Sequence, residues 1–343
     1  MIKDGSEILE KAFFGDSSAS FGLKDGRPIV VEKGLKLNLV HLTAVSPQVT
    51  TTKEALLEIE KFKKMIHQQP RLRLVTNQKE LSKVSKVVTD GQIAVILGMQ
   101  NTPSDILGSD INNKDSILAL REAGISVMAP CYDTTNILGS GCLHTDTGLT
   151  YEGKIFLTRC AENGIIVNLA GCGHRMARDI VEYKKSGLKF NLMASQTGCY
   201  SQYRHIRNLP DDVLKSVAEL GGIVGISMTT YTNDESDNSG FPFKKHLNHA
   251  RLLCGEKSVC VGSGNTYITQ TDEDSRKRFE LMRPVIDPHK TLGARFPEIP
   301  LKISGPEMMK ILCEFSFPYL PNDVWGGIFG KNLLDFFSGA LPS

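Results

Sequence analysis

The sequence predicts a (β/α)₈ barrel, and three observations carry this prediction. Short apolar runs alternate with amphipathic segments of helical length along most of the chain, which predicts a parallel sheet covered by helices. The runs make about eight β/α units, a number that favours a closed barrel over an open doubly wound sheet. Glycines lie just after four helical segments and before the next strand, as expected of helix ends, at Gly164, Gly187, Gly221 and Gly255.

The elements follow one another in a regular order. The predicted strands lie near residues 11–14 and at residues 37–44, 93–98, 125–129, 165–170, 190–194, 223–227 and 259–262. The predicted helices lie at residues 52–68, 78–89, 114–123, 153–163, 176–186, 210–219 and 242–253. Because no repeat or low-complexity linker interrupts them, we expect one domain over residues 1–343. Residues 266–300 form a long charged insertion after the last strand, which we expect to act as a lid or a dimer contact.

Composition excludes several classes of function. Of the 343 residues 41% are hydrophobic and 23% are charged, which is typical of a globular protein. A formal net charge of +2 offers no footprint for nucleic acid or for an anionic membrane. The eight cysteines form no CxxC pair, the N-terminus lacks a secretory apolar core, and no run is long enough to span a membrane. We therefore expect a cytoplasmic protein with reduced thiols.

In a barrel of this kind the chemistry lies where strands end and the following loops begin. Those positions offer mostly amides, hydroxyls and glycines, among them Gln100 and Gln196, which are weak ligands for zinc. Cys172 and His174 stand close together, with Cys131 at a neighbouring strand end. These three residues are either a metal or nucleophile site, or ordinary buried thiols beside a histidine.

The other histidines give a weaker signal. His41 lies inside an apolar strand run and is predicted to face the core or the barrel. His246 and His249 are one helical turn apart, but no further ligand follows them at a suitable spacing. We expect this pair on a solvated helix face.

One segment carries a specific resemblance. RNLPDDVLKSVAELGGIVGIS, residues 207–227, resembles the R-N-[VL]-P-D-[DE]-x-L…GG segment of the membrane (renal) dipeptidase family of zinc metallopeptidases. Further segments are similar to landmarks of that family in the same order, including GLTYEGK, ENGIIVNL, HLNHARLLCG and IFGKNLLDFF. The resemblance covers residues 37–337 and implies a (β/α)₈ barrel that is often dimeric.

The resemblance also implies two zinc ions, yet the residues that would hold them are replaced. Ser and Ala in FFGDSSASFG stand where the first strand should give H-x-D, and Gln100 stands where a bridging Glu should be. Gly171 and Gln196 take the places of two histidines, and Gly264 that of a carboxylate. On the substrate side, Cys131 replaces a histidine and Tyr200 replaces an arginine. We therefore expect no metal at these positions and no cofactor.

Three hypotheses follow. In the first, the barrel has lost its binuclear zinc site and either binds a small amino-acid or peptide-like ligand, through Gln100, Gln196, Tyr200 and Asn265, or serves as a partner subunit, with a homodimer as the expected assembly. In the second, the chain is a re-tooled hydrolase that uses Cys131, Cys172 and His174 in the old pocket, as nucleophile and base or around one zinc ion. In the third, it is an ordinary metallodipeptidase whose ligands lie elsewhere in the sequence.

Overall fold

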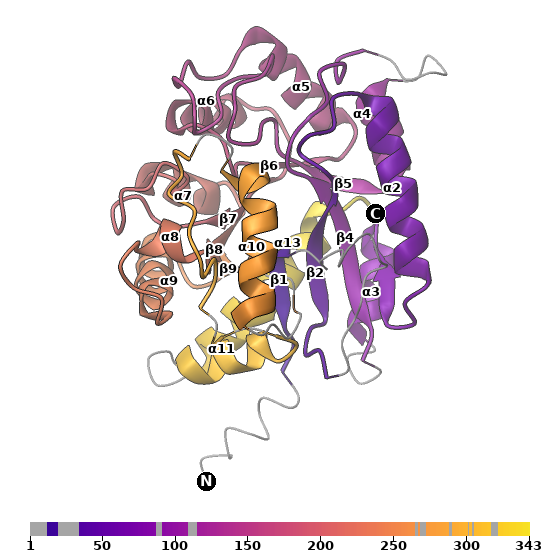
Figure 1. Cartoon of the computed structure of the whole chain (residues 1–343). Coiled ribbons are helices and arrows are strands. Elements are labelled where there is room, and N and C mark those ends of the chain that lie inside the picture. The colour runs from indigo at the N-terminus through magenta and orange to yellow at the C-terminus, as the bar shows by residue number, and fades with distance from the viewer. Residues whose placement is uncertain are drawn as a thin grey trace.

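Eight parallel strands form a nearly closed barrel with helices around it, in the order β1-β2-β4-β5-β6-β7-β8-β9 (Figure 1). The computed structural model describes residues 12–19, 34–86, 91–108, 115–264, 267, 272–287, 290–300, 302–303, 305–316 and 322–343. Within these residues the predicted (β/α)₈ fold is confirmed. The strands are parallel because each β/α unit returns the chain to the same end of the barrel before the next strand begins.

The strands agree with the predicted runs except at two places. They are β1 (Gly15–Ala19), β2 (Leu39–Val45), β3 (Leu72–Leu74), β4 (Ile93–Met99), β5 (Ile125–Met128), β6 (Ile166–Asn168), β7 (Leu192–Thr197), β8 (Ile223–Ser227) and β9 (Val259–Gly262). The prediction of a strand at residues 11–14 was wrong in position, because β1 begins at Gly15, and residue 11 lies outside the described residues. Strand β3 was not predicted, and its three residues pair only with the start of β4.

The helices lie mainly between consecutive strands. They are α2 (Thr52–His67), α3 (Gln78–Lys86), α4 (Ser116–Glu122), α5 (Tyr151–Glu162), α6 (His174–Lys185), α7 (Asp211–Glu219), α8 (Thr230–Asn233), α9 (Phe241–Cys254), α10 (Asp272–Ile286), α11 (Met308–Ser316), α12 (Asn322–Gly326), the π-helix η3 (Gly327–Lys331) and α13 (Asn332–Ala340). The four glycines predicted at helix ends all have positive φ, as a left-handed cap requires. Among the described residues no helix is both long and apolar enough to cross a membrane.

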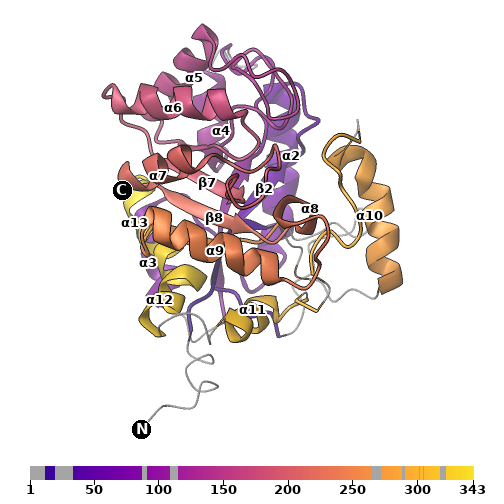
Figure 2. The same cartoon turned by 90° about the vertical axis from the view of Figure 1, so that its left-hand side faces the viewer.

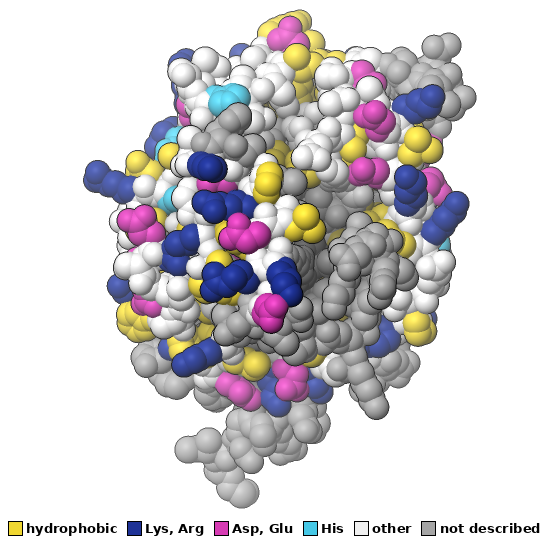
Figure 3. All heavy atoms as spheres, viewed as in Figure 1, with side chains coloured by type: hydrophobic (Ala, Val, Ile, Leu, Met, Phe, Trp, Pro, Cys, Tyr) yellow, Lys and Arg dark blue, Asp and Glu magenta, His cyan; other side chains and the backbone are white. Residues whose placement is uncertain are grey.

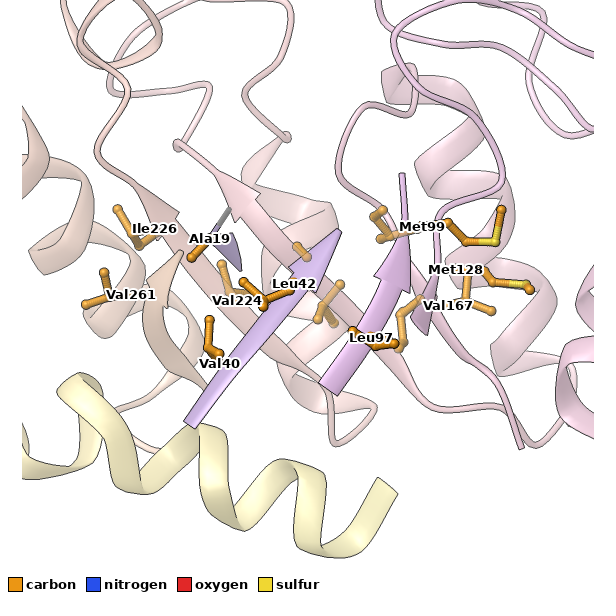
Figure 4. Close-up of a cluster of buried hydrophobic side chains, with 14 of the residues drawn as sticks. Ala19, Val40, Leu42, Leu97, Met99, Met128, Val167, Val224, Ile226 and Val261 are labelled. Atoms are coloured by element: carbon orange, nitrogen blue, oxygen red, sulfur yellow. The ribbon is translucent and has the colours of Figure 1, made fainter. Parts of the chain in front are cut away.

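The outer face of the barrel packs against these helices. In β2, Val40 and Leu42 belong to the same buried cluster as Ile59 and Phe62 of α2, and Figure 4 shows the strand side chains of this layer. The buried residues of α2 recur every three or four positions, which turns one stripe of the helix toward the sheet. Thr51 and Glu54 form a capping box that fixes where α2 begins.

The inner face is apolar at the amino ends of the strands. Leu39, Ile166 and Ile223 share a buried cluster with Leu333 and Phe337 of α13. The Asn332 side chain donates to the carbonyl of Val259, the first residue of β9, at 2.8 Å, and the Asn191 side chain donates to the Ala340 carbonyl at 3.0 Å. Helix α13 therefore closes the amino end of the barrel.

The interior becomes polar toward the carboxyl ends. Ser17 of β1 donates from Oγ to the Ser195 carbonyl of β7 at 2.7 Å, and because these strands are not neighbours, the bond crosses the lumen. Gly225 makes this crossing possible, since a Cβ there would lie 2.1 Å from Ser17 Oγ. The first and last strands are joined by a hydrogen bond just after β9, where the Gly264 N–H donates to the Ser18 carbonyl of β1 at 2.7 Å.

Part of the insertion after β9 forms α10, which stands at one side of the barrel in Figure 2. Phe279 of α10 packs in a small buried cluster with Tyr231, Leu292 and Ala294. Residues 266, 268–271 and 288–289 lie outside the described residues, so a lid or dimer role stays a prediction. On the described part of the face in Figure 3, Lys and Arg side chains are interspersed with Asp and Glu.

Candidate functional site

A small pocket opens at the carboxyl ends of the strands. Its volume is about 40 Å³, which is room for roughly three water molecules. Its lining is mostly neutral and polar: Gln100, Tyr132, Asp133, Ala170, Gly171, Gln196, Thr197, Arg207, Asn208, Ser227, Thr229 and Thr232. These residues follow or end five different strands, as expected of a barrel site. We call this the barrel-end pocket.

Gln196 is the best-connected predicted residue of the pocket. Its Oε1 accepts a hydrogen bond from Ser18 Oγ of β1 at 3.2 Å. Its Nε2 donates to Thr229 Oγ1 at 3.2 Å and more weakly to Ser227 Oγ at 3.4 Å. The amide therefore joins β7 to β1 on one side and to the end of β8 on the other. Gln100, directly after β4, also lines the pocket and is half-buried.

The two glycines at predicted metal positions have positive φ and close neighbours that leave little room for a side chain. Gly171 has φ +89° and Gly264 has φ +68°, a region that residues with a side chain rarely adopt. A Cβ on Gly264 would lie 2.3 Å from Nε2 of Gln196, so the glutamine amide fills the space that a side chain there would need. At Gly171, a Cβ would lie 3.2 Å from the backbone nitrogen of Asp133. The replacements at 196 and 264 thus fit one another.

A buried ion pair forms one wall. The Arg207 guanidinium binds the Asp133 carboxylate and donates to the Tyr132 hydroxyl at 3.1 Å. Burial acts to lower the pKa of Arg207, but the neighbouring Asp133 carboxylate raises it well above its usual value. Burial also raises the pKa of Tyr132. The wall therefore presents one cation and one anion that neutralise each other.

The first strand holds a buried carboxylate, Asp16, that was not among the predicted site residues. Asp16 is fully buried and accepts hydrogen bonds from the Ser18 and Ser263 backbone N–H groups at 3.0 Å each, from Tyr267 Oη at 2.6 Å, and from Ser263 Oγ. Burial raises its pKa to about 6, although these donors act against the shift. Asp16 therefore joins β1 to the end of β9.

His41 lies inside the barrel, as predicted. Its Nδ1 is 2.7 Å from the Ser17 carbonyl oxygen, and a Cβ on Gly98 would lie only 2.2 Å from its Nε2. Burial lowers the pKa of His41 to about 4, so the ring is neutral near pH 7. The prediction of a solvated face for His246 was wrong: it is 1% exposed, and its Nδ1 accepts from the Cys199 N–H at 2.8 Å.

The structure brings the two candidate thiols together but not the candidate imidazole. Cys131 Sγ lies 3.8 Å from Cys172 Sγ, and both residues are buried. His174 Nε2 instead lies 2.9 Å from the Asn208 carbonyl oxygen, and its ring packs edge-on against Tyr200 at 4.7 Å between centroids. Contact with Cys172 and burial raise the pKa of Cys131 well above its usual value. This geometry offers no thiolate–imidazole pair.

Two of the four predicted ligand-binding residues line the pocket. Gln100 and Gln196 do, Tyr200 packs on His174 and is not among the lining residues, and Asn265 lies outside the described residues. Arg207 and Asp133 were missed as pocket residues. Arg207 stood in the RNLPDD segment that carried the resemblance, which was the one available signal, whereas Asp133 reaches the pocket through a loop conformation with φ +59°.

The residues present do not fit a binuclear zinc centre. Such a centre needs several imidazoles and carboxylates, because two divalent ions must be neutralised and held at short range. In the described part of the chain, no three His, Cys, Asp or Glu side chains gather as a metal-binding group. Asp16 already accepts hydrogen bonds from the Tyr267 hydroxyl and the Ser263 backbone N–H, and the amides of Gln100 and Gln196 are neutral.

Fold and site together define a (β/α)₈ barrel protein with its pocket where barrel enzymes carry their chemistry. Within that class the chain belongs to the membrane dipeptidase family, peptidase family M19, whose sequence model matches residues 32–286. It is 24% identical to dipeptidase verJ of Clonostachys rogersoniana over 208 residues, which are 59% of this chain and 51% of that protein. The chain thus spans about half the length of this curated relative.

Solved structures agree on the fold. An amidohydrolase from Pseudomonas aeruginosa superposes with a TM-score of 0.78 at 18% identity and with 98% of each chain covered. A metallopeptidase from Rhodobacter sphaeroides, solved with a phosphinate mimic of the dipeptide L-Ala-D-Ala, superposes with a TM-score of 0.70 at 15% identity, covering 95% of this chain and 98% of that one. At these identities the similarity shows the fold alone.

Proposed function

We propose that this chain is a non-hydrolytic member of the membrane dipeptidase family that binds a small amino-acid-like ligand in the barrel-end pocket. One observation carries the proposal. Where the resemblance requires metal ligands, Gln100, Gly171 and Gln196 line a closely packed, largely neutral pocket, while the barrel around it keeps its complete fold. The pocket has been rebuilt, because Gln196 fills the space beside Gly264 and bonds to three neighbouring hydroxyls.

The absence of hydrolysis follows from the chemistry of these side chains. An amide bond is attacked at neutral pH by water whose pKa a metal ion has lowered, or by an activated nucleophile. Amides and glycines supply neither the charge to hold two divalent ions nor a base. The buried thiol of Cys131 has a raised pKa, which disfavours the nucleophilic thiolate.

The charged wall of the pocket favours a zwitterion. An amino acid carries one carboxylate and one ammonium group, which match the Arg207 guanidinium and the Asp133 carboxylate in charge. The neutral amides of Gln100 and Gln196 offer both donors and acceptors to the rest of such a ligand. The dipeptide mimic bound by the Rhodobacter sphaeroides relative supports this chemical class.

Metal analysis combined with a turnover assay tests the first half of the proposal. The chain is purified untagged and without chelator, its metal content is measured by inductively coupled plasma mass spectrometry, and it is assayed on an unselective set of dipeptides. We expect much less than one zinc per chain and no turnover. Two zinc ions per chain with turnover would show that the ligands lie elsewhere and would overturn the proposal.

Thermal shift and calorimetry with single amino acids and dipeptides test the second half. A ligand at 100 times its Kd stabilises the folded state by about 2.7 kcal/mol, which is a readily measured rise in Tm. Gln196→Ala should weaken this binding, whereas Gln202→Ala, which changes an exposed glutamine outside the pocket, should not. Equal binding by both variants would place the ligand elsewhere, and no shift with any compound would favour the partner-subunit hypothesis.

Rebuilding the zinc positions gives a further test. The triple variant Gln100→Glu, Gly171→His, Gln196→His is expected to remain inactive, because the first strand still supplies no H-x-D pair and residue 171 has positive φ. Dipeptidase activity in this variant would show that the first strand was misinterpreted.

The re-tooled hydrolase is distinguished by thiol reactivity. A nucleophilic Cys131 or Cys172 would react with iodoacetamide at neutral pH faster than the remaining thiols. Since burial and mutual contact raise the pKa of Cys131, we expect both to react slowly. Selective fast labelling of either one would favour that hypothesis over ligand binding.

A further inference from the structure

Cys131 contacts two other sulfur atoms next to the barrel-end pocket, since Cys131 and Cys172 are chain neighbours of the lining residues Tyr132 and Gly171. Cys131 follows β5, Cys172 lies in the loop after β6, and Met176 lies in the first turn of α6. Cys131 Sγ is 3.8 Å from Cys172 Sγ and 3.6 Å from Met176 Sδ. The three residues are between 0% and 2% exposed. The loop after β5 and the segment that begins α6 thus place Cys131 in contact with both a second thiol and a thioether.

The spacing matches a shared metal ion. A metal–thiolate bond is about 2.3 Å long, so sulfurs bound to one ion lie about 3.8 Å apart in a tetrahedral arrangement and about 4.0 Å apart in a trigonal one. The two measured separations, 3.8 and 3.6 Å, need to change by only a few tenths of an ångström. For the two sulfur pairs that include Cys131, a shared metal ion therefore requires no large rearrangement.

Neighbouring groups hold the thioether in place. The Asp146 carboxylate accepts hydrogen bonds from the Arg175 N–H at 2.5 Å and from the Met176 N–H at 3.3 Å. These bonds cap the first turn of α6 and fix the backbone position of Met176. Gly139 leaves room for the end of the side chain, since a Cβ there would lie 2.7 Å from Met176 Sδ. Cys172 is held by a backbone bridge with Gly141.

Binding of a metal ion at the two thiols requires no change of oxidation state. When one cation binds Cys131 and Cys172 as thiolates, each thiol loses its proton to solvent.

We propose that Cys131, Cys172 and Met176 form a binding site for one soft monovalent cation, Cu(I) or its analogue Ag(I). Thiolate and thioether donors select soft ions, and a thioether is not among the usual ligands of Zn(II), which takes four donors from Cys, His and carboxylates. His174 has no part in this site, because its Nε2 lies at the Asn208 carbonyl. The site is separate from the proposed ligand function and stands if that function fails.

Anaerobic titration of the reduced chain tests this proposal. Cu(I) is added in competition with a chromophoric chelator such as bicinchoninate, and X-ray absorption identifies the bound atoms. We expect one Cu(I) per chain with sulfur neighbours only, and a rise in Tm with Ag(I). Cys131→Ser and Cys172→Ser should abolish binding. Met176→Leu conserves volume, should fold, and should weaken binding by about tenfold or more.

Matched controls separate the site from general effects. Cys160→Ser and Met308→Leu change equally buried sulfurs elsewhere and should bind Cu(I) as the wild type does. The proposal is overturned if Met176→Leu binds as tightly as the wild type, if the Cys160→Ser control loses binding equally, or if the bound ion has nitrogen or oxygen neighbours.

Discussion

The barrel interior is apolar at the amino ends of the strands and polar at their carboxyl ends. At the amino end Leu39, Ile166 and Ile223 pack with Leu333 and Phe337 of α13 in a continuous apolar cluster. At the carboxyl end the interior holds hydroxyls, amides, a histidine and two carboxylates, nearly all of them hydrogen-bonded within the chain, among them Ser17, His41, Asn168, Ser195, Gln196, Asp16 and Asp133. One end is built for packing and the other retains polar groups that cost free energy to bury.

This difference bears on the proposal that the carboxyl end no longer holds a zinc centre. An apolar cluster tolerates changes that conserve volume, whereas a buried polar network fails when one partner is lost. The carboxyl end offers amides and glycines where the resemblance implies zinc ligands, and most of its buried polar atoms are hydrogen-bonded, with His41 Nε2 among the exceptions in the described residues. We infer that the pocket is maintained rather than decaying, and the following predictions test this contrast.

The largest effect is expected at the apolar end. Phe337→Ala removes a fully buried ring from the helix that closes the barrel and should lower the free energy of unfolding by about 3–5 kcal/mol. Urea denaturation followed by circular dichroism measures it. Phe336→Ala, next to it and only half-buried, should cost clearly less. Equal losses would show that α13 does not seal the barrel.

The buried ion pair should come next. Asp133→Asn leaves the Arg207 charge buried without its partner and should cost about 3 kcal/mol, while Asp212→Asn, in an exposed pair with Arg178, should cost less than about 1 kcal/mol. The double variant Asp133→Asn with Arg207→Gln should recover part of the loss. The free energy of unfolding in urea checks each value. Similar losses in both single variants would mean that Asp133 is effectively solvated.

Asp16 should impose a pH dependence of opposite sign to that of His41. Burial raises the pKa of Asp16 from 3.8 to about 6, so the folded state binds more protons than the unfolded state between these values. Its contribution is full below pH 3.8 and is lost as pH rises through 6, by at most roughly 3 kcal/mol. Burial lowers the pKa of His41 from 6.5 to about 4, so its contribution is lost as pH falls through this range.

Asp16→Asn separates these two contributions. The variant should gain stability more steeply than the wild type between pH 4 and 6.5, because the opposing titration of Asp16 is gone while that of His41 remains. Urea midpoints at several pH values measure this. Parallel curves for the two proteins would show that Asp16 is ionised throughout the range.

The smallest effect tests the fit between two replaced positions. Gly264→Ala strains the backbone at a positive φ and must also displace the Gln196 amide. Gly255→Ala strains only the backbone, at φ +82°, since no atom lies near the position of its Cβ. We expect Gly264→Ala to cost about 1 kcal/mol more than the control. Gln196→Ala in the same chain should remove that excess, and additive losses in the double variant would argue against the contact.

The fold could be predicted from the sequence because its signals are local. Apolar runs of strand length, amphipathic helices and glycines at helix ends each depend on residues a few positions apart, and seven of the predicted strands were confirmed. The chain gave no such signal for β3, whose three residues are too few for a pattern. His246 was wrongly placed on a solvated face because its partners, the Cys199 N–H and the Asn233 carbonyl, come from other segments.

The sequence by itself determined the barrel and the family, and it placed neutral residues such as Gln100 and Gly171 at the ends of the strands. Only the tertiary structure decided which side chains meet: that Arg207 pairs with Asp133 in the pocket, that Asp16 joins β1 to β9, and that Cys131 finds Met176 rather than His174. The physical reason is distance along the chain. Secondary structure depends on nearest neighbours, whereas a site is assembled from loops whose side chains meet only after the barrel has closed.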